Sequence, residues 1–264
     1  MLENFYSVMS PAKGTMKLND SVSFSYILSE NPRASVHTGW SLALGCMSYD
    51  ILNKIDSLYK TGVKDIYIVG YSQGGAIAYL LTNYFYYLQK NKKLNKNIIF
   101  KTYCNAAPKP GNIYFAYDYE SHTRNWAFNI VNAADWVPQS PFSVETPMDM
   151  SITNPFLNSE SLFGKQKFPK NLIIKYTFNK MYKPLYKTQK KNKKYFGNKI
   201  TPKVQNYLPG FEPPEFSNYT YYARCGQYIV MYPDADYYKI FPKKTDKVWI
   251  HHMPKAYIYL AKRL

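Results

Sequence analysis

The sequence predicts an α/β fold in which a mostly parallel β-sheet is covered by helices on both faces. Three observations support this prediction. Strand-like and helix-like segments alternate along the chain, the expected strands are continuously apolar, and one strand–turn–helix unit carries a recognisable turn. The length of 264 residues suits one domain of moderate size. We therefore expect residues 1–264 to form a single domain.

The first elements are short. Residues 5–10 predict a strand, and residues 16–36 read as polar and irregular. A helix is expected over residues 41–59, because apolar side chains recur there at spacings of three and four. These side chains are Leu44, Met47, Ile51, Ile55 and Leu58.

The sheet is expected to form from the middle of the chain onward. A strand beginning at Ile66 leads into the turn, and a helix follows that ends near Lys96. Apolar runs bounded by polar loops predict the remaining elements. They are strands over residues 98–104, 125–131 and 226–232, and a terminal helix over residues 255–264.

Residues 140–220 differ from the rest of the chain in composition. They are rich in Pro, Lys, Asn and Tyr and show little periodicity, which predicts a basic, partly irregular insertion before the last strand. Within it, residues 161–203 hold 13 Lys and no Asp, Glu or Arg, and the whole chain has a net charge of +17.

Two explanations of this charge remain open. One is an electropositive face that contacts anionic membranes. The other is a biased composition, because Asn, Tyr and Ile are abundant together with Lys. Nucleic-acid binding is not expected, since Arg is scarce and no nucleic-acid module is recognisable.

The chain shows no targeting segment that we recognise. Its first residues lack a basic region followed by an apolar one, so no signal peptide is expected. Residues 66–89 carry no charge, but their Ser, Gln, Asn and Gly residues fit the turn better than a membrane span. A cytoplasmic location is the default expectation. Three Cys residues without framework spacing predict buried free thiols rather than disulfides.

The turn is the G-Y-S-Q-G-G sequence at residues 70–75. Between an apolar strand and an apolar helix, G-x-S-x-G is typical of a nucleophile elbow, which exposes a serine on a sharp turn. Ser72 is the predicted nucleophile. Gly70 and Gly74 are expected where a side chain would collide with the crossing backbone. The backbone N–H of Gln73, at the helix N-terminus, is the predicted oxyanion donor.

A serine nucleophile needs a general base. The chain has four histidines, His37, His122, His251 and His252. In α/β-hydrolases the base follows the serine and the acid along the chain, which favours the C-terminal pair. We prefer His252, because H-M-P-K-A-Y begins there just before the terminal helix. His251 remains the alternative.

The acid that orients the base should follow a strand of the sheet after the elbow. Asp135 lies in N-A-A-D-W-V-P, directly after the strand expected over residues 125–131. An Asp that forms only a local turn is the other interpretation. No metal-ligand spacing and no phosphate-binding loop are present, so we expect no metal and no cofactor.

Several ordered motifs resemble the class 3 lipase family, a branch of the α/β-hydrolase fold. Residues 36–40, V-H-T-G-W, are similar to the family's V-H-x-G-F/W. Residues 105–116 resemble G-S/A-P-R-V-G-N-x-x-F-A, and residues 129–138 resemble R-V-V-N-x-x-D-x-V-P. The elbow is usually G-H-S-L-G-G; here Tyr71 and Gln73 replace His and Leu. Tyr222 to Gly226 resembles the family's Y-x-H-x-G.

The resemblance implies serine-dependent hydrolysis of carboxylic esters of lipids, such as acylglycerols or phospholipids, through a Ser-Asp-His triad. The family's second oxyanion donor comes from an R-G-T or R-G-S turn, which assigns this role to Thr15 in K-G-T. The family's lid follows that turn, so residues 16–34 are its expected place, with Tyr26, Ile27 and Leu28 as its apolar face.

A second function stays open. The chain begins close to the K-G-T turn, so leading strands of the family's sheet are expected to be absent. The altered turn and the early start are also compatible with an inactive or truncated relative. Such a protein would bind anionic membranes or partners through its Lys-rich segment.

Overall fold

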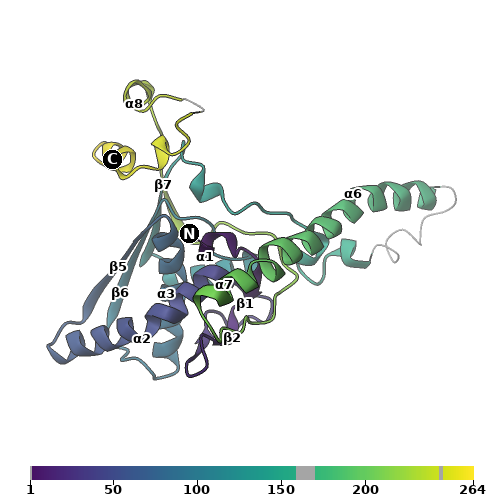
Figure 1. The fold of residues 1–264 in the computed structure, drawn as a ribbon. Coiled ribbons are helices and arrows are strands. Elements are labelled where there is room, and N and C mark those ends of the chain that lie inside the picture. Colours follow the sequence, from purple (N-terminus) through teal and green to yellow (C-terminus); the bar gives the residue numbers. More distant parts are fainter. Residues whose placement is uncertain (1, 159–169, 244–245) are drawn as a thin grey trace.

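A computed structural model describes residues 2–158, 170–243 and 246–264 (Figure 1). Its centre is a parallel sheet in the order β5-β6-β7-β8. The strands span Asp65–Tyr71, Ile99–Asn105, Ala127–Asn132 and Gln227–Met231. Each of the four expected strands of the sheet is therefore present, within three residues of its predicted ends.

Helices α2 (Thr38–Lys60), α3 (Gln73–Lys90) and α4 (Ile113–Thr123) pack into the core beside the sheet. Alternate residues of β5 and β6 point to this face, where Ile68 and Cys104 are buried. The elbow helix ends at Lys90, earlier than predicted, and α4 was not predicted at all. The strand–helix–strand order explains why the sheet is parallel.

The second face of the sheet is covered mainly at its carboxyl end. There the C-terminal helix α9 (Pro254–Ala261) packs with Ile130 and Met231. Helix α8 (Ala235–Ile240) contributes Tyr237 to the same cluster. Further toward the start of β5, Tyr67 and Val69 are exposed. Among the described residues, the expected helical cover of this face is thus partial.

The N-terminal region differs from its prediction. Helix α1 (Leu2–Phe5) precedes β1 (Met9–Pro11), which pairs antiparallel with β4 (Ser35–His37). Strands β2 (Lys13–Lys17) and β3 (Ser23–Ile27) form a second antiparallel pair.

Residues 16–34 were predicted to be irregular and to form a lid. Instead, the side chains of β3 alternate between buried and exposed positions, and Tyr26 and Leu28 are buried in the core. The predicted apolar face of a lid is therefore core packing of a hairpin. The lid assignment is wrong for these residues.

The insertion at 140–220 is also more regular than predicted. Its described elements are η2 (Pro147–Asp149), η3 (Pro155–Asn158), α6 (Lys170–Asn192), the π-helical turn η4 (Lys193–Asn198) and α7 (Thr201–Tyr207). Helix α6 extends away from the sheet (Figure 1). Part of the predicted insertion, residues 159–169, lies outside the described residues. Within the described ranges, no helix has both the length and the apolar character needed to cross a bilayer.

Candidate active site

Ser72 stands alone between two elements, because β5 ends at Tyr71 and α3 begins at Gln73. Its backbone has φ 56° and ψ −124°, a conformation that residues other than glycine rarely adopt. The Ser72 N–H donates to the Asn105 carbonyl at 2.8 Å, which ties the turn to the end of β6. This strained, anchored turn is the geometry of a nucleophile elbow.

The glycines around Ser72 have different reasons for being there. A Cβ at Gly70 would lie 2.2 Å from the Gly74 carbonyl oxygen, and one at Gly75 would lie 2.7 Å from the Ala107 Cβ. A Cβ at Gly74 would meet nothing within 4 Å. The prediction that Gly70 is sterically required is thus supported, whereas the one for Gly74 is wrong. The second crowded position is Gly75.

Three predicted residues form one hydrogen-bonded chain. The Ser72 Oγ lies 2.8 Å from the His252 Nε2, and the His252 Nδ1 lies 2.7 Å from the Asp135 Oδ2. Asp135 follows β7, and His252 ends the short helix η5 (Ile250–His252). Both side chains are buried, and the Val137 N–H also donates to the Asp135 Oδ1 at 3.0 Å.

His251 is held elsewhere. Its Nδ1 lies 2.8 Å from the Tyr237 hydroxyl, and its carbonyl accepts a hydrogen bond from Asn132 at 3.0 Å. Burial lowers the pKa of this imidazole, which favours its neutral form. His252 is therefore the histidine that contacts Ser72, whereas the adjacent His251 packs against Tyr237 of α8.

Two tyrosines that sequence reasoning missed complete the site. The Tyr257 hydroxyl donates to the Asp135 Oδ2 at 2.8 Å, and the Tyr71 hydroxyl donates to the His252 carbonyl at 2.5 Å. Burial, with a smaller contribution from the Asp135 charge, raises the pKa of both phenols, so both remain donors. Tyr71 is the elbow position that departs from the resembled motif, which was the available signal.

The remaining histidines have structural surroundings. His37 caps α2, accepting from the Trp40 N–H at 3.3 Å, and its ring stacks on the Trp40 ring at 3.7 Å between centroids. Burial lowers the pKa of His37 to about 3. The His122 ring stacks on Tyr86, and burial lowers its pKa to about 4.

The two predicted oxyanion donors end up apart. The Gln73 N–H belongs to the first turn of α3, where backbone donors lack partners within the helix. Thr15 hydrogen-bonds Ser25 and borders a different pocket, shared with Leu88 near the other end of α3. Fifteen residues of helix separate Gln73 from Leu88, a rise of about 22 Å. The assignment of Thr15 as an oxyanion donor is therefore wrong, because its hairpin packs at the far end of this helix.

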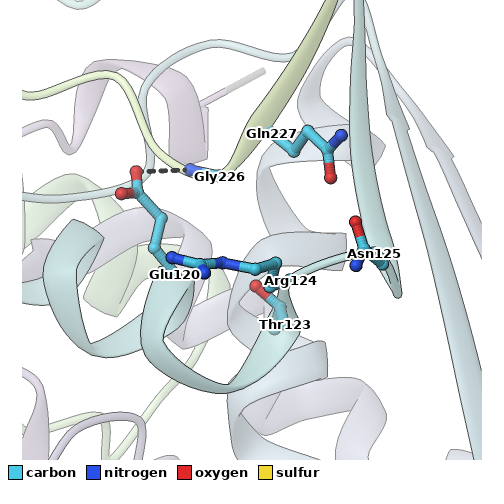
Figure 2. Close-up of a pocket in the computed structure, with 6 residues that line it drawn as sticks. All are labelled: Glu120, Thr123, Arg124, Asn125, Gly226 and Gln227. Atoms are coloured by element: carbon cyan, nitrogen blue, oxygen red, sulfur yellow. Dashed lines mark hydrogen bonds between the residues drawn. The ribbon is translucent and has the colours of Figure 1, made fainter.

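Ser72 opens onto a cavity of about 680 Å³ with a mainly apolar lining. Its lining includes Trp40, Pro108, Val137, Val144 and Phe196. A separate polar pocket of about 330 Å³ lies at the amino ends of β7 and β8, between Glu120, Asn125 and Gln227 (Figure 2). That pocket lies at the amino ends of the strands, whereas Ser72 follows the carboxyl end of β5. We therefore expect the chemistry at the apolar cavity.

Three solved structures are similar to part of this chain. A lipase from Rhizopus microsporus var. chinensis is 26% identical over 42% of this chain and 37% of its own, with a TM-score of 0.35. The Lip2 lipase of Yarrowia lipolytica is 24% identical over 41% and 39%, with a TM-score of 0.35. A mutant form of MDLA from Penicillium cyclopium is 22% identical over 44% and 39%, with a TM-score of 0.36.

The match thus spans less than half the length of each of these structures. A search of curated proteins gave no match. The family model described as lipase (class 3) matches residues 3–145, more than half of the 264 residues. On this match, the chain belongs to the class 3 lipase family.

Proposed function

We propose that the protein hydrolyses carboxylic esters of lipids by a serine-dependent mechanism. The observation that carries the proposal is the hydrogen-bonded chain from Ser72 through His252 to Asp135 beside an apolar cavity. An apolar lining suits an acyl chain, because burying each methylene contributes about 0.8 kcal/mol. Family membership supports the same reaction class.

In the proposed first half-reaction, the Ser72 Oγ attacks the ester carbonyl carbon while its proton passes to the His252 Nε2. Asp135 holds the imidazole in the required tautomer and stabilises its charged form. The Gln73 N–H donates to the oxyanion, and such a donor is worth about 10²-fold or more in turnover. His252 then protonates the leaving alcohol, and an acyl-serine remains.

The second half-reaction repeats these roles with water as the nucleophile. His252 takes a proton from water, the hydroxyl oxygen attacks the acyl-serine carbonyl, and the proton returns to the Ser72 Oγ as the bond breaks. The products are a carboxylic acid and regenerated serine. Every proton movement in this sequence uses a side chain of the described site.

The test is turnover of p-nitrophenyl esters of several chain lengths by wild type and Ser72→Ala. We expect loss of more than about 10⁴-fold in kcat, since removing the nucleophile disables the whole triad. Circular dichroism of both proteins controls for folding. Hydrolysis that survives in Ser72→Ala would contradict the proposal.

The choice of base is tested by a matched pair of neighbours. We expect His252→Ala to lose activity on a scale similar to Ser72→Ala, because both act in one unit. His251→Ala should retain most activity, since that imidazole meets Tyr237 rather than Ser72. Loss confined to His251→Ala would overturn the assignment.

The second candidate function is an inactive relative that binds through its basic segment. The observation in favour of this function is the position of Thr15 away from Ser72, which leaves the Gln73 N–H as the single oxyanion donor that we assign. A fluorophosphonate probe distinguishes the two, since it reacts only with an activated serine. Labelling that disappears in Ser72→Ala supports the hydrolase; a folded protein that never labels supports the inactive relative.

A further inference from the structure

Helix α6 carries a stripe of lysines on one face. Lys180, Lys183, Lys187 and Lys191 follow one another at spacings of three, four and four, which places them on the same side of a helix. All four are exposed. The other side of the helix turns toward the body of the protein, where Gln189 is buried and donates to the Asn218 carbonyl.

The charge of this lysine stripe is unbalanced within the described chain. Residues 161–203 contain no Asp or Glu, and no ion pair of the described residues involves any of the four lysines. Like charges one turn apart on a helix destabilise it. An extended anionic surface would relieve this repulsion along the whole stripe at once.

The stripe ends at the Ser72 cavity. Lys191 lines that cavity together with Thr188 and Tyr195, so the last turns of α6 and the start of η4 form part of its wall. The C-terminal end of the lysine stripe is therefore part of the cavity wall, so a surface bound along the stripe would reach the cavity at Lys191.

The cavity also has an exposed aromatic rim. Six of its lining side chains are large aromatics that remain open to solvent: Phe142 (99% exposed), Phe5 (55%), Trp249 (53%), Tyr195 (45%), Trp136 (43%) and Phe196 (40%). A contiguous exposed apolar patch marks an interaction surface. Aromatic side chains beside lysines are the composition of surfaces that lie in the head-group region of a bilayer.

We propose that the lysine stripe and the aromatic rim together bind an anionic lipid surface and hold the mouth of the Ser72 cavity against it. The aromatic rim favours a lipid surface over a nucleic acid, which would contact the lysines and leave Phe142 in water. The proposal rests on the proposed function only for what the cavity does once it is docked.

The test measures binding separately from hydrolysis. Ser72→Ala protein is sedimented with phosphatidylcholine vesicles that contain or lack phosphatidylserine, at low and high salt. We expect binding that needs the anionic lipid and weakens with salt, because the stripe acts through exposed charges. Binding that ignores both anionic lipid and salt would overturn the proposal.

A charge-matched pair of variants locates the surface. Lys180→Gln, Lys183→Gln and Lys187→Gln are combined in one variant, and Lys54→Gln, Lys64→Gln and Lys96→Gln in the control. The control lysines are exposed; two of them precede β5 and β6, at the edge of the sheet away from Ser72. We expect roughly 100-fold weaker vesicle binding in the stripe variant only, at about fivefold per lysine. Equal loss in both variants would mean unspecific attraction and overturn the proposal.

Two further arms complete the experiment. Phe142→Ser should weaken vesicle binding; unchanged binding would remove the aromatic rim from the proposal. A stripe variant that loses affinity for single-stranded DNA but keeps it for vesicles would overturn the lipid assignment.

Wild-type turnover of a soluble short-chain ester is assayed in parallel. Its absence beside intact salt-sensitive binding contradicts the proposed function alone, whereas turnover without such binding contradicts this inference alone.

Discussion

At the residue scale, two phenols hold the proposed acid and base in place. Tyr257 donates to the same Asp135 oxygen that meets His252, and Tyr71 donates to the His252 carbonyl. The two tyrosine rings also meet edge to face, with centroids 5.5 Å apart. We infer that the tyrosines are positioning residues, because they contact Asp135 and His252 and do not line the cavity.

We predict that Tyr257→Phe lowers kcat by about 10- to 100-fold, since a hydrogen bond to a charged group is worth about 1.5–3 kcal/mol. KM should change little, because Tyr257 does not line the cavity. The measurement is a full kinetic profile on a soluble ester. Tyr259→Phe, on the same helix and away from Asp135, is the control. A rise in KM with kcat unchanged would contradict a positioning role.

The sequence predicted the three residues of the hydrogen-bonded chain because chain order constrains them. Ser, acid and base follow one another in a set order, and only two histidines follow Asp135. Tyr257 could not be found this way, since its partner lies 122 positions earlier and no motif links them. Thr15 was misassigned because a K-G-T triplet says nothing about which end of α3 its hairpin packs against.

At the element scale, the elbow depends on how closely α3 approaches β5. We predict that Gly70→Ala destabilises the protein by about 3 kcal/mol or more, because its Cβ would overlap the Gly74 carbonyl, which is backbone and cannot move aside. Gly74→Ala should leave stability unchanged or raise it by up to about 1 kcal/mol. Urea unfolding of both variants measures the difference. Similar losses in both would contradict the crossing geometry.

Helix α6 and the hairpin of β2 and β3 were missed because their hydrophobic patterns are weak. In α6, Leu172, Ile173 and Ile174 are consecutive, and Pro184 lies inside the continuous helix at a position where the sequence alone favours a break, so no apolar stripe is visible in the pattern. In the hairpin of β2 and β3, apolar and polar side chains alternate over only a few residues. One of the buried side chains is Tyr26, whose hydroxyl makes it a weak signal of burial in the sequence. The sheet strands were predictable because long apolar runs between turns are distinctive.

At the scale of the whole molecule, the core encloses a titratable group that the proposed chemistry does not use. His37 is fully buried between the ring of Trp40 and that of Tyr222, whose own pKa burial raises far above neutral. Burial lowers the pKa of His37 to about 3, against 6.5 in the unfolded chain. The unfolded chain therefore binds a proton between these two pH values, and the folded one does not.

This difference in proton binding makes the folded protein less stable as the pH falls. Stability from His37 is fully present above pH 6.5 and is lost as pH falls toward about 3, by about 1.4 kcal/mol per pH unit.

We predict that His37→Asn, which can still cap α2, lowers stability at pH 7 but makes its decline on acidification shallower by about that slope. Trp40→Phe, which keeps the imidazole, should be destabilised with the wild-type slope. Urea unfolding from pH 7 to pH 4 measures all three proteins, and comparing slopes removes the contribution of the other titrating groups. An unchanged slope in His37→Asn would mean that the imidazole is protonated in the folded core.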